Sequence, residues 1–182
     1  MVLAQFVTDS GVYKFLVVLH ILTAIIGFGA VFFNGTYGSQ SKARPGPEGL
    51  AITQANLVVS RIAEYFIYAV FVFGVLMVFL SPDDRYQFED MFVWLSIVLY
   101  LLGIGISHGL LWPNVRRMAA LATELVAMGP PPTQPPPPGT AQPAPPPQVM
   151  EIERHARIVG MADVALKIIL VAILCLMVWK PL

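Results

Sequence analysis

The sequence predicts an all-α membrane protein, a polytopic four-helix bundle with an up-down arrangement of its transmembrane spans. Its 182 residues are 57% hydrophobic and only 12% charged, whereas about 25% of the residues of a soluble domain are charged. Four apolar runs of about 20 residues are each long enough to cross a hydrocarbon core about 30 Å thick. Because lipid offers the backbone no hydrogen-bond partners, each run is predicted to be a helix. The runs are 12–33, 62–80, 91–112 and 158–179, in one four-helix domain, 1–182.

The composition also excludes several classes of protein. The formal net charge is zero, so no excess of positive charge is available for nucleic acid. Cys175 is the single cysteine, which excludes an internal disulfide and a thiolate metal cluster. The three tryptophans lie at ends of apolar runs, where indole rings anchor at the membrane interface; they are Trp94, Trp112 and Trp179. The lipid bilayer is therefore the partner that the composition indicates.

The first run is predicted to be a retained span, because it is longer than the apolar core of a signal peptide, about 7–15 residues. The oxygen-bearing side chains of 8–10 precede it and suit a helix start. Polar and small residues recur along this run at helical spacing and should share one face that points into the bundle. This stripe consists of His20, Thr23, Gly27, Val31 and Asn34.

The segments around the second run follow from turn chemistry and charge. Residues 38–49 carry glycine, proline and serine without periodicity and are predicted to be a loop. Residues 50–60 are predicted to be helical and to lead into the second run. That run opens with Arg61 and Glu64, which can pair across one turn. Two alternatives follow: the two side chains snorkel to the interface, or they form a polar layer near the cytoplasmic surface with His108, Arg157 and Asp163. Residues 81–90 form the predicted second loop.

The third run carries small residues four apart, a pattern typical of closely packed membrane helices. These are Gly103, Gly105, Ser107 and Gly109, with the intramembrane His108 among them. Pro113 and Asn114 are expected to reset the backbone, after which apolar residues recur at helical spacing from 115 to 128. We therefore expect an amphipathic helix on the cytoplasmic side that either lies on the membrane or extends the bundle.

Eleven of the sixteen prolines lie in 129–147. This composition predicts an extended, Pro-rich cytoplasmic linker rather than helix or sheet. In the last run Asp163 and Lys167 stand four residues apart, and either charge alone would be costly in mid-bilayer. We expect an internal ion pair; the functional alternative is a proton or ion relay, or a charge that faces a cofactor.

Basic residues predict the orientation, because the loops that stay inside carry an excess of lysine and arginine. With the N-terminus outside, the inner side holds Lys42, Arg44, Arg61, Arg116, Arg117, Arg154 and Arg157, and the outer side only Lys14, Arg85 and Lys180. The sequence thus predicts a multi-pass protein of a bacterial cytoplasmic (inner) membrane with both termini outside.

Along 14–30, and on to Asn34 and Gly35, the chain resembles the opening helix of a family of predicted bacterial integral membrane proteins, domain-of-unknown-function family 2269. The shared pattern is an aromatic-aliphatic lead, the pair Leu19-His20, and then small residues with glycines and a polar exit. The order of four spans with a long inner segment before the last is similar too. The resemblance implies this topology and no settled activity.

A more distant likeness is to the copper-resistance-D-like and protoporphyrinogen-oxidase-like four-helix membrane proteins. In these, a first-helix histidine and a later lysine are associated with haem or substrate, which implies His20 and Lys167 as the corresponding residues. The chain differs in having Gly27-Phe28 where a tryptophan usually follows that histidine.

Three functions follow as hypotheses. The leading one is a non-catalytic accessory or scaffold subunit of a larger bioenergetic membrane complex, which would contact other membrane subunits or a second copy of itself. The first alternative is a haem-b-binding redox or porphyrin-handling protein, with His20 as axial ligand and Lys167 beside it, since the two lie at comparable depths. The second is a small proton-coupled transporter that uses Asp163, Lys167 and His20.

Overall fold

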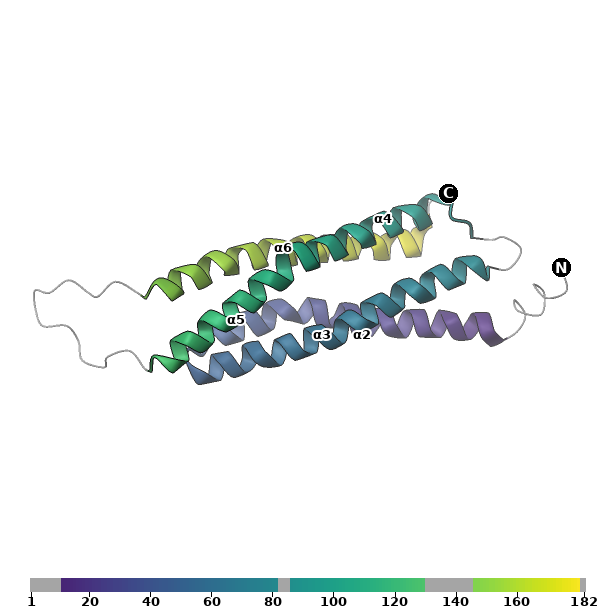
Figure 1. The fold of residues 1–182 in the computed structure, drawn as a ribbon. Helices are drawn as coiled ribbons and strands as arrows, with labels where there is room; N and C mark the ends of the chain where they lie inside the picture. The colour runs from purple at the N-terminus through teal and green to yellow at the C-terminus, as the bar shows by residue number, and fades with distance from the viewer. Residues whose placement is uncertain (1–10, 82–85, 130–145, 181–182) are drawn as a thin grey trace, which may run out of the picture.

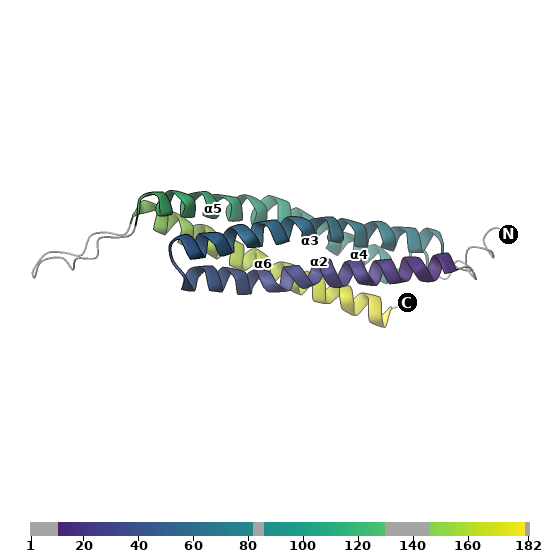
Figure 2. The same ribbon diagram turned by 90° about the horizontal axis from the view of Figure 1, so that it is seen from below.

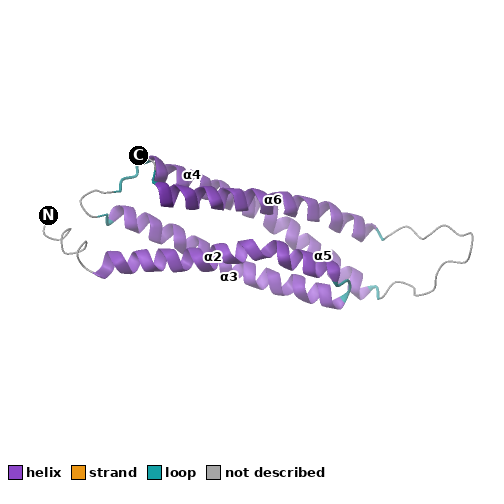
Figure 3. Ribbon diagram, turned by 180° about the vertical axis from the view of Figure 1, so that it is seen from behind, coloured by secondary structure: helices purple, strands orange, loops and turns teal. Residues whose placement is uncertain are grey.

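The computed structural model describes residues 11–81, 86–129 and 146–180, and these are helical with no strand among them (Figures 1 and 3). The helices are α2 (Gly11–Ala43), α3 (Pro47–Phe79), α4 (Met91–Ile106), α5 (Trp112–Ala127) and α6 (Pro147–Trp179). A short π-helix, η2 (Ser107–Leu111), joins α4 to α5. Most of the predicted Pro-rich linker lies outside the described residues.

Four of these helical stretches are long and apolar enough to cross a membrane, which confirms the all-helical, membrane-spanning prediction. Three of them have 33 residues and the fourth, Met91–Ala127, has 37. At about 1.5 Å per residue a helix of this length is about 50 Å long, against a hydrocarbon core of about 30 Å. Each helix therefore continues well beyond the apolar run that predicted it.

The predicted loop 38–49 is wrong in its bounds, because α2 continues to Ala43 and α3 begins at Pro47. Hydrogen bonds between the two helices explain the extension. The Ser41 hydroxyl donates to the Gly49 carbonyl oxygen over 2.9 Å and lies 2.7 Å from the Thr53 hydroxyl. These bonds give polar residues 38–43 a tertiary partner that turn chemistry alone did not reveal.

The predicted backbone break at Pro113 is also absent, since α4, η2 and α5 form one continuous helical stretch. Proline removes one helical hydrogen bond and its ring crowds the carbonyl four residues earlier. The wider π-turn directly before Pro113 accommodates that ring without ending the helix. The amphipathic segment after 112 is therefore an extension of the third span.

The helices form two pairs (Figures 1 and 2). α2 and α3 pack against each other along their length, and α6 packs against α4, η2 and α5. The pairs meet where α5 approaches α3 and where α6 approaches α2, whereas α4 has no Cα within 8 Å of the Cα atoms of α2 or α3. The space between the pairs is consequently bridged by side chains in several places.

The predicted polar stripe of α2 faces α3, which confirms that it points inward. Thr23 and Gly27 are the buried residues of α2. A Cβ atom on Gly27 would lie 3.0 Å from the Ile67 side chain and 3.1 Å from its backbone nitrogen. The absence of a side chain at Gly27 therefore permits the close approach of the two helices.

We predict that Gly49→Ala destabilises the α2–α3 hairpin. A Cβ atom at Gly49 would lie 2.1 Å from the Arg44 carbonyl oxygen and 2.6 Å from that of Ser41, and both are backbone atoms that cannot rotate away. The free energy of unfolding in mild detergent should fall by about 2 kcal/mol. Gly38→Ala is the matched control, because its Cβ would meet nothing within 4 Å. It should be neutral or stabilising by up to about 1 kcal/mol; equal effects of the two variants would contradict this interpretation of the hairpin.

Candidate functional site

A cavity of about 2070 Å³ lies between the two helix pairs and is lined by residues of every described helix. It begins at the chain reversal between α2 and α3, at Arg44–Pro47, and reaches Tyr100 on α4 and Ile173 on α6. Binding sites for drug-sized ligands commonly measure about 300–1000 Å³. The cavity is larger than that, and it follows directly from the separation of the helix pairs.

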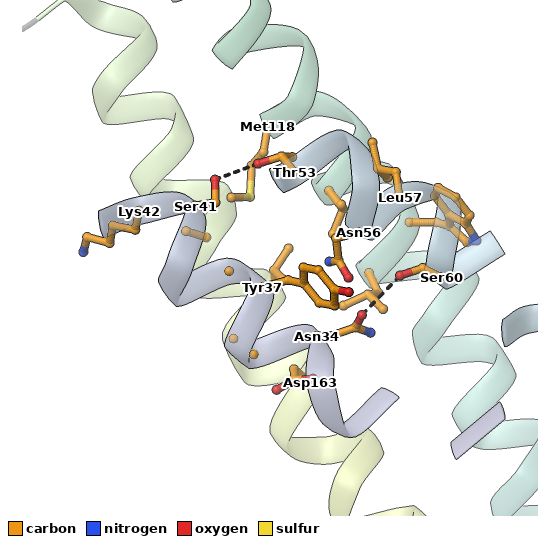
Figure 4. A pocket seen from close by; sticks show the side chains of 18 of the residues that line it. Asn34, Tyr37, Ser41, Lys42, Thr53, Asn56, Leu57, Ser60, Met118 and Asp163 are labelled. Atoms are coloured by element: carbon orange, nitrogen blue, oxygen red, sulfur yellow. Dashed lines mark hydrogen bonds between the residues drawn. The ribbon is translucent and has the colours of Figure 1, made fainter. Parts of the chain in front are cut away.

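One wall of the cavity is polar and belongs to α2 and α3 (Figure 4). The Ser60 hydroxyl donates to the Asn34 side-chain oxygen over 3.2 Å. Tyr37 and Asn56 lie next to each other beside this bond in the cavity lining. The Asn56 side-chain oxygen is buried and has no hydrogen-bond partner among the described residues. The polar wall therefore retains hydrogen-bonding capacity that the protein itself does not use.

A second polar cluster bridges the two helix pairs around Glu64 of α3. One Glu64 carboxylate oxygen accepts a hydrogen bond from the Tyr68 hydroxyl at 2.6 Å and lies 2.8 Å from His108 Nε2. The other carboxylate oxygen accepts one from the Trp112 indole N–H at 3.3 Å. Arg61 does not take the place predicted for it beside Glu64; its guanidinium lies over the Trp112 ring, 5.7 Å from the centroid.

The π-helix η2 sets the position of this cluster, since His108 lies within it and Trp112 directly follows it. A π-turn holds one residue more than an α-turn, so it rotates the residues after it about the helix axis. His108 and Trp112 both reach Glu64 across the gap between the pairs. Such single π-turns occur often at functional sites.

His108 has an oxygen beside each ring nitrogen. Nδ1 lies 3.1 Å from the Ile104 carbonyl oxygen, and Nε2 lies 2.8 Å from Glu64 and 3.0 Å from the Tyr68 hydroxyl. A carbonyl oxygen only accepts, so Nδ1 carries a proton. Nε2 can then accept from Tyr68 in the neutral ring or donate to Glu64 in the charged ring. The cluster thus accommodates either form of the histidine.

The predicted ion pair of α6 is present. Lys167 Nζ donates to an Asp163 carboxylate oxygen over 2.7 Å, and both side chains are largely buried. The pair lies against Gly35 of α2, whose missing Cβ would be 3.4 Å from Lys167 Nζ. Asp163 lines the cavity. Each charge therefore has its partner in the same helix, and Gly35 provides the space for both.

His20 lies elsewhere in the bundle. Its Nδ1 donates to the Val70 carbonyl oxygen over 2.9 Å, and its ring packs on Gly74 of α3. Lys167 is beside Gly35, fifteen residues from His20 and so about 22 Å further along α2. His20 lines neither this cavity nor a smaller one between α2 and α3. The structure therefore does not bring His20 close to Lys167 or Asp163, the residues beside which the haem and transporter hypotheses placed it.

The small residues of the third span do not all pack within the chain. Gly103 faces α6, where its Cβ would lie 3.7 Å from Leu166 and Ile169, and Ser107 lines the cavity. Gly105 and Gly109 are exposed, with open space where their Cβ atoms would lie. The predicted close-packing residues therefore point in two directions: Gly103 and Ser107 face the interior, whereas Gly105 and Gly109 share a face that points outward.

Within the described residues, no group of three or more His, Cys, Asp or Glu side chains is arranged to hold a metal ion. Sequence reasoning placed Glu64 and His108 in a polar layer but missed their contact with Tyr68 and Trp112. The signal that could have found it is the polar residue pair Glu64 and Tyr68, which are one turn apart on a single helix face.

The chain matches no protein-family model, no curated protein and no solved structure. Its function must therefore be argued from its own geometry.

We predict that Glu64→Ala destabilises the protein, because it removes the acceptor shared by Tyr68, His108 and Trp112. Hydrogen bonds to a charged group contribute about 1.5–3 kcal/mol, so the free energy of unfolding in detergent should fall by about 2 kcal/mol. Trp112 fluorescence should shift as its N–H loses the carboxylate. Glu89→Ala is the control, since Glu89 is exposed in the segment before α4. A loss below about 0.5 kcal/mol for Glu64→Ala would show that the cluster does not hold the helix pairs together.

Proposed function

We propose that this chain is a non-catalytic accessory subunit of a larger complex in a bacterial inner membrane. The observation that carries the proposal is the outward face of Gly105 and Gly109, two small residues on the third span that none of the other described helices covers. In lipid, small residues four apart allow the backbones of two helices to approach closely. A transmembrane helix of another subunit fits this face.

The surroundings of the two glycines support this interpretation. Val98, Leu101 and Leu102 precede them on the same helix and are at least half exposed. Aliphatic side chains beside a glycine face supply the contact area around a close helix crossing. An accessory role also agrees with polar groups that have partners within the chain: Asp163 is paired with Lys167, and Glu64 accepts hydrogen bonds from Tyr68 and Trp112.

The proposal includes the topology predicted from the basic residues. The four spans form an up-down bundle with both termini outside, α5 extends the third span on the cytoplasmic side of the membrane, and the Pro-rich segment lies in the cytoplasm. The polar ends of α2 and α3, around Ser41 and Thr53, then also extend beyond the hydrocarbon core on the cytoplasmic side. The positive-inside rule supports this orientation.

The partner face can be tested with Gly105→Leu and Gly109→Leu. Both side chains would enter open space, so the isolated chain should stay folded. Co-purification of the native membrane complex in mild detergent should fall at least about tenfold, the result of losing about 1.4 kcal/mol of binding free energy. Gly29→Leu is the matched control, because Gly29 of α2 also has open space at its Cβ position. Unchanged co-purification in both test variants would refute the partner face.

The topology can be tested with single cysteines in a Cys175→Ala background. Gln87→Cys lies in the exposed segment before α4. It should react with a membrane-impermeant maleimide in spheroplasts, which lack the outer membrane but keep the inner membrane intact. Thr140→Cys, in the Pro-rich segment, should react only after lysis. The opposite pattern would reverse the proposed orientation, and labelling of both positions in intact cells would contradict the four-span topology.

A further inference from the structure

We propose that the cavity between the helix pairs binds a membrane amphiphile with an uncharged, hydrogen-bonding head group. The head group contacts the polar wall at Asn34, Tyr37, Asn56 and Ser60, and the apolar chain lies against α5 and α6. This inference is independent of the proposed accessory role, because the cavity is inside the bundle and the partner face is outside it.

Unused hydrogen-bonding capacity on the polar wall is the first argument. The Asn56 side-chain oxygen is buried without a partner among the described residues. Asn34 accepts from Ser60 through its oxygen, while its N–H₂ group donates to no described residue. Buried polar atoms in native proteins are nearly always hydrogen-bonded, so an orphaned one needs a partner, which is either water or a ligand. An acceptor and a donor are both unused here, which suits a hydroxyl head group that donates and accepts.

The opposite wall gives the second argument. Facing the asparagines, α5 and α6 present aliphatic and thioether side chains to the cavity: Val115, Met118, Ala122, Leu125, Val149, Ile152 and Val159. Figure 4 shows Met118 across the cavity from Asn56. A ligand that contacts both walls must therefore carry a polar and an apolar part, and the bilayer is the source of such molecules.

The charges around the cavity argue for an uncharged head group. The Asp163 carboxylate is paired with Lys167, and the Glu64 carboxylate accepts hydrogen bonds from Tyr68 and Trp112. The other charged groups of the lining lie away from Asn34: Lys42 points away from the polar wall (Figure 4), Arg44 is ten residues and so about 15 Å further along the axis of α2, and Glu153 is ten residues before Asp163 on α6. A charged head group beside Asn34 and Asn56 would meet neutral amide and hydroxyl groups there and would be costly to bury. Neutral amide and hydroxyl groups suit a neutral ligand instead.

Trp112 lines the cavity and can report on its occupant. The test uses the full chain with Trp94→Phe and Trp179→Phe, reconstituted in phosphatidylcholine vesicles, so that Trp112 is the single tryptophan. Diacylglycerol with brominated acyl chains is the probe, since bromine quenches indole fluorescence only at short range. We expect saturable quenching at low mole fractions of diacylglycerol, and weaker, non-saturating quenching by brominated phosphatidylglycerol, whose head group is anionic.

Two kinds of variant separate the site from the surrounding lipid. Asn34→Leu with Asn56→Leu should raise the half-saturating mole fraction about tenfold or more, the effect of losing two hydrogen bonds. Gly160→Phe should abolish saturable quenching, because Gly160 lines the cavity and its Cβ would enter open space. Gly105→Phe adds the same ring on the outer face and should leave the quenching unchanged.

Each other outcome overturns the inference. Equal, non-saturating quenching by both lipids, unaffected by Gly160→Phe, would mean that the cavity holds water and that the bromines act from the surrounding bilayer. Stronger, saturable quenching by phosphatidylglycerol would overturn the uncharged head group. The Gly160→Phe variant keeps the test decisive if the double asparagine variant fails to fold. None of these results depends on co-purification, so the accessory role stands or falls separately.

Discussion

The structure depends on one polar cluster that joins the two helix pairs and sets the distance between them. The cluster consists of Glu64, Tyr68, His108 and Trp112. Glu64 and Tyr68 belong to α3, whereas His108 and Trp112 belong to the η2–α5 segment, and the bonds between them join the two helix pairs where α5 approaches α3. In lipid the hydrophobic effect does little to draw helices together, so polar contacts and close packing decide how they associate. Here close packing holds α2 to α3, and polar and aromatic side chains hold that pair to the other.

A second bridge repeats the arrangement nearer the end of the bundle at which α4 begins. Tyr100 of α4 stacks on Phe71 of α3 with 4.6 Å between ring centroids, and its hydroxyl donates to the Ile67 carbonyl oxygen over 3.4 Å. The large side chains of Tyr100 and Phe71 thus fill the space between α4 and α3 and keep the two backbones apart. Beyond these bridges, toward the α2–α3 reversal, the interior is occupied by the cavity instead. The cavity is therefore a consequence of which residues bridge the pairs, and it does not reflect a general lack of packing.

Much of the fold could be predicted from sequence because membrane helices obey local rules. Run length and hydropathy gave the four spans, and a separation of four residues gave the Asp163–Lys167 pair. The stripe on α2 followed from helical periodicity, since Thr23 and Gly27 share a face. In each case the deciding interaction lies within one helix or along one helical face, which a sequence shows directly.

The candidate site could not be predicted in the same way. Glu64 and His108 are 44 positions apart in the sequence. Their contact depends on the position of α4 relative to α3 along the bundle axis, and on a π-turn that the spacing of apolar residues does not reveal. The prediction that His20 and Lys167 lie at comparable depths was wrong for the same reason. Depth counted from span ends assumed that all helices begin at one level, whereas the structure places Lys167 beside Gly35. Register between helices is a tertiary property, set here by close backbone contacts such as those that the absence of a side chain at Gly27 and Gly49 permits.

The η2 segment connects the inner and outer features of the third span. Gly109 lies inside this π-turn and faces outward, while its neighbour His108 reaches inward to Glu64. A π-turn is less tightly wound than the α-helix on either side, so a small rotation there changes the position of both residues. The single π-turn therefore gives two neighbouring residues opposite directions, one toward the other helix pair and one toward the surface of the bundle.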